Sequence, residues 1–148
     1  VGQFVLRAEV AGYIGEAQGS GLGQNAVRCN TLNALAGVDW YPGNDWNISV
    51  QYCHKYTSGN LAALSVYRNA GLATARLSKE LLHNTLKLST FAYIDVASGG
   101  IFNRLSASYS LNDDIELTVG YDYFHANKGK FAMYGKNSEV WVKMKYSF

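Results

Sequence analysis

The sequence predicts an all-β fold in which about eight antiparallel strands follow one another up and down, each with an apolar and a polar face. The clearest evidence is residues 138–148 (SEVWVKMKYSF), where every second side chain is apolar up to the last residue. Charged side chains in the other segments also keep to one parity. Composition agrees, because 11 Tyr and 3 Trp favour strands and membrane–water boundaries.

Alternation and turn residues together delimit the strands. In the first strand, Phe4 and Leu6 share one parity, whereas Arg7 and Glu9 share the other. Gly-rich or polar segments separate the strands, and Pro-Gly-Asn-Asp at 42–45 is typical of a tight turn. The expected strands cover about residues 3–14, 31–41, 46–57, 68–78, 85–95, 101–111, 115–123 and 138–148.

The fourth strand has an alternative, because Leu and Ala in residues 61–82 fall near helical spacing. Gly71 and the alternation of apolar and polar side chains after it favour a strand over about 68–78. A turn at 79–84 is then expected to lead into the fifth strand.

The connections alternate in length, as in outer-membrane β-barrels, which have short periplasmic turns and longer extracellular loops. No apolar run approaches the roughly 18–20 residues of a spanning helix, whereas a barrel strand needs only about 9–11. Residues 1–148 are therefore expected to form a single antiparallel up-and-down transmembrane β-barrel domain, or a segment of one. Short connections are expected at 42–45, 79–84 and 112–114, and longer ones at 15–28, from 57 into the sixties and at 126–137, with 96–100 intermediate.

Charged side chains within the expected strands lie on the parity opposite the apolar stripe. A charge facing lipid at mid-membrane costs about 2–4 kcal/mol, so a bilayer accounts for this exclusion. A soluble β domain with its polar face in water accounts for the alternation equally well, but less well for aromatic residues near the strand ends. The side chains expected to line the lumen are Arg7, Glu9, Asp39, Lys55, Arg76, Lys87, Arg104, Glu116, Asp122, Lys143 and Lys145, with Asp95 and Glu139 on the same parity.

The lumen set is nearly balanced in charge, which predicts weak ion selectivity. Pairing the sixth and seventh strands about Asp113 places Arg104 opposite Asp122 as an opposite-charge pair. This pair could hold the barrel wall, tune the lumen, or do both.

Several functional classes are disfavoured. A net charge of +2 is too small to argue for nucleic acid. Cys29 and Cys53 fall on opposite arms of a hairpin, with Cys53 opposite about residue 33, so both are expected to be free thiols. Neither spacing suggests a metal site, and no cofactor is expected.

The three His residues raise the alternative of a lipid-modifying enzyme, because small outer-membrane barrels of that kind pair a His with Ser or Asn and an acid. His54 falls on the lipid-facing parity, His125 at the outer rim and His83 in a short turn. A Ser nucleophile needs its base within hydrogen-bond reach, and no suitable Ser spacing accompanies these residues. No catalytic residue is therefore expected.

Three stretches resemble the C-terminal portion of a porin-like outer-membrane family of proteobacteria, much of it uncharacterised. They are TARLSKELLHNTLKLSTFAYID (74–95), ASYSLNDDIELTVGYDYF (107–124) and VWVKMKYSF (140–148). The resemblance implies a bacterial outer-membrane location, a passive or channel-like role and no catalytic residues. Outer-membrane lipid and lipopolysaccharide are therefore the expected partners, and Lys128, Lys130 and Lys136 of the 126–137 loop could contact lipopolysaccharide phosphates or simply be solvated. The last stretch also resembles the assembly signal read by the barrel-assembly machinery, with the elements Val140, Val142, Met144, Tyr146 and Phe148.

We therefore expect an outer-membrane channel or porin-like protein for passive passage of small solutes. The main alternative is a small closed eight-stranded barrel that acts as a surface anchor or adhesin-like protein. The many small side chains on the wet parity, such as Ser106, Ser108 and Ser110, favour a wider lumen because a narrow barrel would leave gaps among them. The chain also opens on a strand-like segment with no visible leader, so earlier strands are expected to be absent from it.

The assembly signal is tested by comparing Phe148→Ala with Lys145→Ala. The first variant should reach the outer membrane at a much lower level, because the signal consists of the aromatic and apolar parity. Surface levels measured by protease accessibility in cells should remain near wild type for Lys145→Ala. Equal levels for the two variants would rule out the signal.

Overall fold

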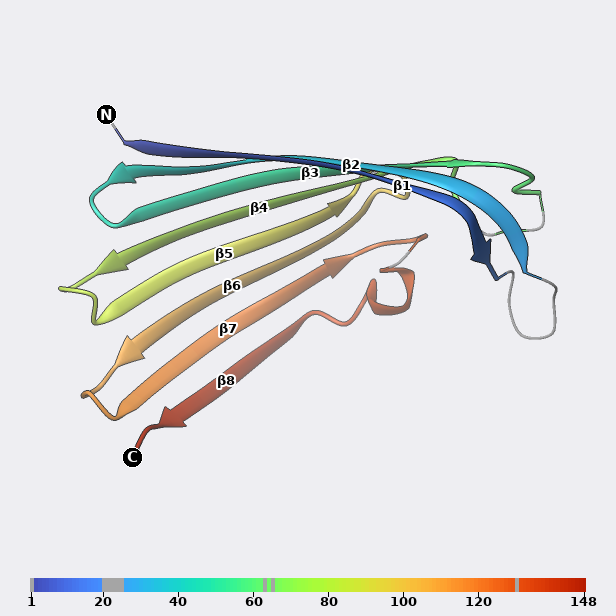
Figure 1. Ribbon diagram of the computed structural model, residues 1–148. Helices are drawn as coiled ribbons and strands as arrows, with labels where there is room; N and C mark the ends of the chain where they lie inside the picture. Colours follow the sequence, from blue (N-terminus) through green and yellow to red (C-terminus); the bar gives the residue numbers. More distant parts are fainter. Residues whose placement is uncertain (1, 20–25, 63, 65, 130) are drawn as a thin grey trace.

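In the computed structural model, which describes residues 2–19, 26–62, 64, 66–129 and 131–148, eight strands form one antiparallel sheet (Figure 1). Each strand pairs with its neighbours in the chain, as expected for an up-and-down order. β1 and β8 form the two edges, and no pairing between them occurs among the described residues. The strands are β1 (Gln3–Gln18), β2 (Val27–Gly43), β3 (Trp46–Ser58), β4 (Asn69–Leu81), β5 (Leu86–Asp95), β6 (Gly100–Ser110), β7 (Ile115–His125) and β8 (Glu139–Tyr146).

The connections sort to the two ends of the sheet. The short β2–β3, β4–β5 and β6–β7 turns lie at one end, on the left of Figure 1, together with both chain termini. The β3–β4 and β7–β8 loops lie at the other end, and the second contains the 3-10 helix η1 (Ala132–Tyr134). No helix among the described residues is long and apolar enough to cross a membrane.

The first two strands are longer than the sequence predicts. Residues 15–28 were expected to form a loop, but β1 continues to Gln18 and β2 begins at Val27. A bulge between Tyr13 and Glu16 makes this extension possible, with Gly15 at a φ of 67°. A positive φ is easily adopted by glycine, so the residue that suggested a loop instead allows the pairing to continue.

The fourth element is a strand, β4, and the helical alternative over 61–82 is wrong. Cross-strand hydrogen bonds to β3 and β5 outweigh the helical spacing of a few Leu and Ala side chains. The strand also runs on to Leu81, so the turn expected at 79–84 starts later than predicted. Leu82, His83 and Asn84 all have positive φ and form the turn.

The β2–β3 turn is likewise tighter than expected. Pro42 and Gly43 belong to β2, and only Asn44 and Asp45 lie between the strands. Their φ values of 52° and 60° are those of a two-residue turn with both central residues left-handed, which matches the right-handed twist of a hairpin.

The strand register aligns the alternate residues of all eight strands, so the sheet has two continuous faces. Cross-strand partners share a face, so each pairing carries the parity of one strand to the next. Asp39 pairs with Ser49, Ser49 with Arg76, Arg76 with Phe91, Phe91 with Arg104, Arg104 with Asp122 and Asp122 with Glu139. By the same chain of partners, all eleven residues expected to line the lumen lie on one face, here called the polar face.

The burial of side chains is inverted relative to a soluble domain. Among the described residues, the most buried hydrophobic ones are Cys29, Leu64 and Ala126. Large apolar side chains on the opposite face, here called the apolar face, are exposed, with Leu6 at 80% and Val10 at 75%. The most buried polar side chains are Thr31, Thr57, Ser78, Asp95, Thr118 and Asp122.

Gly120 is tested as the residue that makes room for the indole of Trp141, its partner on β8. A Cβ on Gly120 would overlap the indole ring, so Gly120→Ala should lower the free energy of unfolding by about 1–3 kcal/mol. The matched control is Gly12→Ala, because a Cβ there meets nothing within 4 Å. Urea titration in detergent micelles measures both, and an equal effect of the two changes would show that the Trp141 contact is unimportant.

Candidate functional site: the polar face and its cavity

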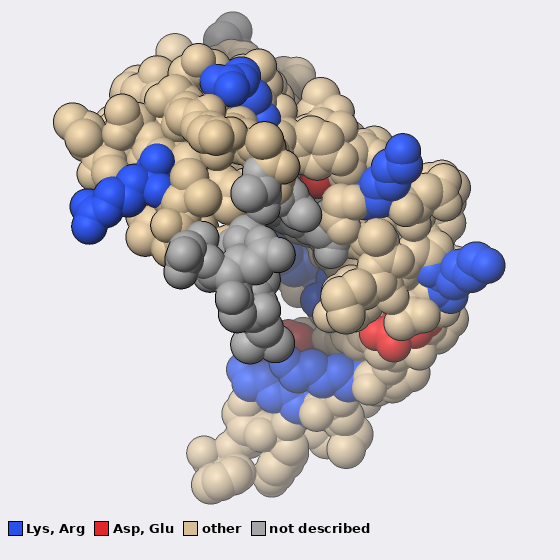
Figure 2. All heavy atoms as spheres, turned by 90° about the vertical axis from the view of Figure 1, so that its right-hand side faces the viewer, with Lys and Arg blue, Asp and Glu red and all other residues tan. Residues whose placement is uncertain are grey.

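The polar face lines a hollow in the molecule. Figure 2 views the molecule from the end that carries the long loops, and Lys, Arg, Asp and Glu atoms are visible inside the hollow. Ion pairs join several of these groups: Arg7 Nη2 lies 2.8 Å from Asp39 Oδ1, and Lys87 Nζ lies 3.0 Å from Glu80 Oε1. Both pairs are partly exposed, so each contributes little to stability. Their main effect is to neutralise charge along the face.

The most elaborate polar cluster surrounds Asp122, whose side chain is almost fully buried. Arg104 donates from both Nε, at 2.7 Å, and Nη2 to the two carboxylate oxygens, as the sequence-based pairing predicts. Trp141 Nε1 donates a further hydrogen bond of 3.1 Å to Asp122 Oδ1. The Arg104 guanidinium also lies 5.3 Å from the centre of the Trp141 ring. A buried carboxylate is tolerated here because it is fully hydrogen-bonded.

Trp141 is the member of this cluster that sequence reasoning did not single out. In the sequence it is one of the residues that alternate with the apolar ones in the segment 138–148. Its position opposite Gly120 was the available signal, because a glycine across from a large aromatic leaves space for the ring.

A cavity of about 1100 Å³ opens on the polar face between β1–β4 and the long loops. Its walls combine charged groups with aromatic and apolar ones. The β3–β4 loop closes one side with Leu64, Val66 and Tyr67, and Gly129 of the β7–β8 loop lies at another. The charged and polar side chains that line it are Glu9, Tyr13, Gln18, Asn33, Lys55 and Asp95.

The β7–β8 loop folds over the polar face through aromatic contacts. The Phe131 ring meets Tyr93 of β5 edge-on, with centroids 5.4 Å apart, and Tyr134 lies 5.7 Å from Phe124 of β7. Phe91 and Tyr93 are aromatic residues on the otherwise polar face, and Tyr93 is the one that receives this loop. The loop was expected only as a polar connection, and its Phe131 and Tyr134 were the overlooked signal.

Glu16 places a carboxylate beyond the bulge, at the long-loop end of β1. Thr31 Oγ1 donates to it at 2.7 Å and Gln18 Nε2 at 3.0 Å. These hydrogen bonds, Thr31 first, lower the pKa of Glu16 because they favour the ionised form. Glu16 therefore keeps its negative charge to a lower pH than an unpaired Glu, next to Gln18, which lines the cavity.

The His residues lie apart from one another. His54 is on the apolar face, where its Nδ1 is 3.1 Å from the Tyr52 hydroxyl and its Nε2 is 3.3 Å from Asn69 Oδ1. His83 lies in the β4–β5 turn and His125 ends β7. In the described ranges, no three His, Cys, Asp or Glu residues gather as metal ligands.

The cysteines and the terminal strand are placed as follows. Cys29 and Cys53 are free, as predicted, although Cys53 pairs with Leu35 rather than with about residue 33. The assembly-signal residues Val140, Val142, Met144 and Tyr146 share the apolar face of β8. Phe148 follows the strand, with its ring centroid 6.3 Å from that of Tyr146. The five residues therefore form one exposed apolar row.

Comparison of the chain with protein-family models, with curated proteins and with solved structures finds no match. The functional inference below consequently depends on the geometry of the two faces and on the residue patterns.

The Arg104–Asp122 pair is tested by a double-mutant cycle with alanine at each position. We expect a coupling free energy of about 1.5–3 kcal/mol, toward the lower end because half of the Arg104 side chain faces solvent. The same cycle on Arg7 and Asp39 should give about 0.2–1 kcal/mol. Urea titrations in micelles supply both values, and a smaller coupling for Arg104–Asp122 would contradict its structural role.

Proposed function

We propose that the chain forms part or all of a β-barrel in the bacterial outer membrane and acts as a channel for small polar solutes. The observation that carries the proposal is the inversion of the two faces. In the described residues, the buried groups are mostly polar and the exposed face is apolar across all eight strands. A soluble sheet buries its apolar face against a second layer, whereas a sheet in lipid exposes that face and turns its polar groups inward.

The apolar face also has the height of a membrane. Aromatic residues border it at the short-turn end, where Phe4 stacks on Trp40 with centroids 5.6 Å apart. On β3, the span from Trp46 to Tyr56 covers ten residue steps. At about 3.4 Å per residue and a tilt of about 45°, the span rises about 24 Å, close to the roughly 25 Å apolar band of outer-membrane barrels.

A lumen wider than that of a closed eight-stranded barrel suits the polar face. An eight-stranded barrel is just wide enough for its own side chains to fill. Here the face has small side chains at its middle, with Ser89 hydrogen-bonded to Ser106 at 2.7 Å and Ser108 to Thr118 at 2.9 Å. Small groups that pair with their neighbours leave the centre open. The free edges of β1 and β8 would then pair with further strands.

The charge of the face suits neutral or zwitterionic solutes. A row of cross-strand partners crosses the polar face from Asp39 to Glu139. In this row Asp39 is paired with Arg7 and Asp122 with Arg104, and these ion pairs cancel most of its fixed charge. Arg76 lies in the same row and forms no ion pair within the described part of the chain. Glu9 and Lys143 likewise lie near the middle of their strands without an ion pair in that part of the chain, so Arg76 is one of the groups placed to influence ions that pass.

Conductance in planar lipid bilayers tests the channel. The native protein should give stepwise openings with weak ion selectivity. Arg76→Glu should shift the reversal potential toward cations, because it places a negative charge on the polar face. The control, Arg76→Lys, keeps a positive charge at the same position and should leave the reversal potential nearly unchanged. A silent membrane with correctly folded protein would exclude a channel and favour the closed surface-anchor barrel.

A further inference from the structure

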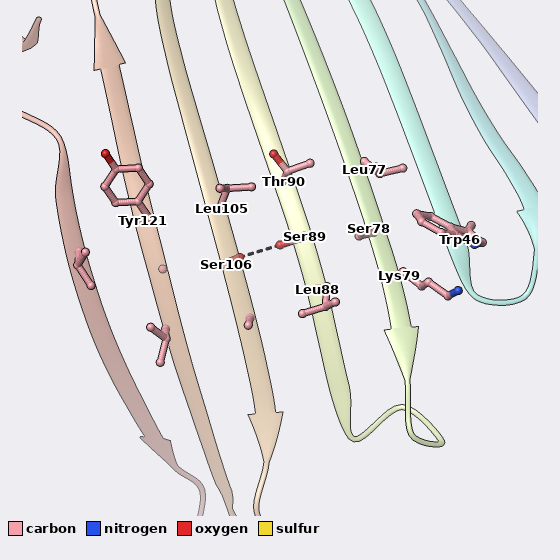
Figure 3. Close-up of a pocket in the computed structure, with 14 residues that line it drawn as sticks. Trp46, Leu77, Ser78, Lys79, Leu88, Ser89, Thr90, Leu105, Ser106 and Tyr121 are labelled. Carbon is pink, nitrogen blue, oxygen red and sulfur yellow. Dashed lines mark hydrogen bonds between the residues drawn. The ribbon is translucent and has the colours of Figure 1, made fainter.

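Among the described residues, a shallow trough lies open on the apolar face. It has a volume of about 550 Å³, within the range typical of ligand sites, and runs across the strands from β3 to β8 (Figure 3). Two rows of side chains form its walls, and the backbone of the residues between them forms its floor. One wall contains Leu77, Leu105 and Tyr121, and the other contains Leu88, Ala107 and Val119.

The ammonium group of Lys79 lies at one end of this trough. Lys79 pairs with Trp46 across β3 and β4, and its ammonium lies 4.7 Å from the centre of the indole ring. From β3 to β8, Lys79 is the only Lys, Arg, Asp or Glu among the described strand residues on the apolar face. The sequence pattern had assigned it to a turn, so its position on the apolar face was not foreseen.

We propose that the trough binds one phospholipid, with the phosphate at Lys79 and an acyl chain along the trough. The proposal rests on the membrane location proposed above. The site matches an amphiphilic ligand, because a cation beside an indole ring lies at one end and a path lined by aliphatic groups and Tyr121 leads away from it. From β4 to β8 the path spans four strand spacings, about 19 Å, which suits an extended acyl chain.

The position of Lys79 and Trp46 along the membrane normal identifies the leaflet from which the lipid comes. Lys79 and Trp46 lie close to the short turns, at the end opposite the long loops. Lys and Trp are both favoured at membrane–water boundaries, where the ammonium reaches the headgroups. The lipid is therefore a phospholipid of the leaflet on the short-turn side rather than lipopolysaccharide on the long-loop side.

A second copy of the chain is a poorer occupant. Its apolar face would cover the Lys79 ammonium without offering a partner for the charge, and an unpaired buried charge is costly. A phosphate provides that partner and leaves the headgroup in water.

Native mass spectrometry of the whole protein in detergent tests the site, with phosphatidylglycerol and diacylglycerol of the same acyl chains as probes. Wild type should retain one phosphatidylglycerol in preference to diacylglycerol. Lys79→Gln should reduce the affinity for phosphatidylglycerol about fivefold, whereas Lys79→Arg should preserve it. Ala107→Phe should weaken both lipids by filling the trough. Lys143→Gln on the polar face and Ala36→Phe on the apolar face outside the trough are the controls and should bind as wild type does.

Unchanged preference in Lys79→Gln, or unchanged retention in Ala107→Phe, would overturn the site. So would a stable dimer or trimer that Ala107→Phe dissociates, since the trough would then be a contact between copies. A heat-dependent shift in gel migration and bilayer conductance are measured on the same preparations. Normal conductance without lipid preference overturns the lipid site alone, whereas loss of membrane insertion in wild type overturns the proposed function and this site with it.

Discussion

The structure depends on the hydrogen-bond register that runs through all eight strands. Because partners on neighbouring strands share a face, a slip of one residue anywhere would move apolar side chains to the polar face for the rest of the sheet. The two irregularities, between Tyr13 and Glu16 and between Trp40 and Gly43, lie toward the strand ends. The central part of the sheet therefore keeps its two faces separate, and both candidate sites follow from that separation.

On the polar face, hydrogen bonds take the place of an apolar core. Asp122 is buried against Arg104 and Trp141, and Asp95 accepts the backbone N–H of Ala97 at 3.0 Å. Asp122 and Asp95 offset their desolvation through such partners, whereas the buried hydroxyl of Thr57 has no hydrogen-bond partner among the described residues. The surface of the wall is polar. The β7–β8 loop adds an aromatic layer at the long-loop end. A lining of this kind suits passage of small polar molecules better than tight binding of one of them.

On the apolar face, the few polar and charged side chains are more informative than the many apolar ones. His54, Tyr52 and Asn69 satisfy one another near the long-loop end, so their polar atoms do not face the apolar surroundings unpaired. Within the part of the chain that the structure describes, the only partner of the Lys79 ammonium is the π-face of Trp46. This cation, which has no anionic partner among the described residues, lies beside an apolar trough. The phosphate and an acyl chain of a phospholipid match these two features in the proposed site.

Alternation by itself determined the all-β class, the number of strands and the face of each expected lumen residue, because side-chain direction in a strand has a period of two. Pairing the sixth and seventh strands about Asp113 even located the Arg104–Asp122 pair. Only the tertiary structure determined the lengths of β1 and β2, because the sequence does not distinguish a glycine at a bulge from a glycine in a loop. Lys79 was misplaced for a related reason, because cross-strand bonds extend β4 past its clear alternation. The cavity, the folded β7–β8 loop and the trough join residues distant in the chain, and only the register across strands brings those together.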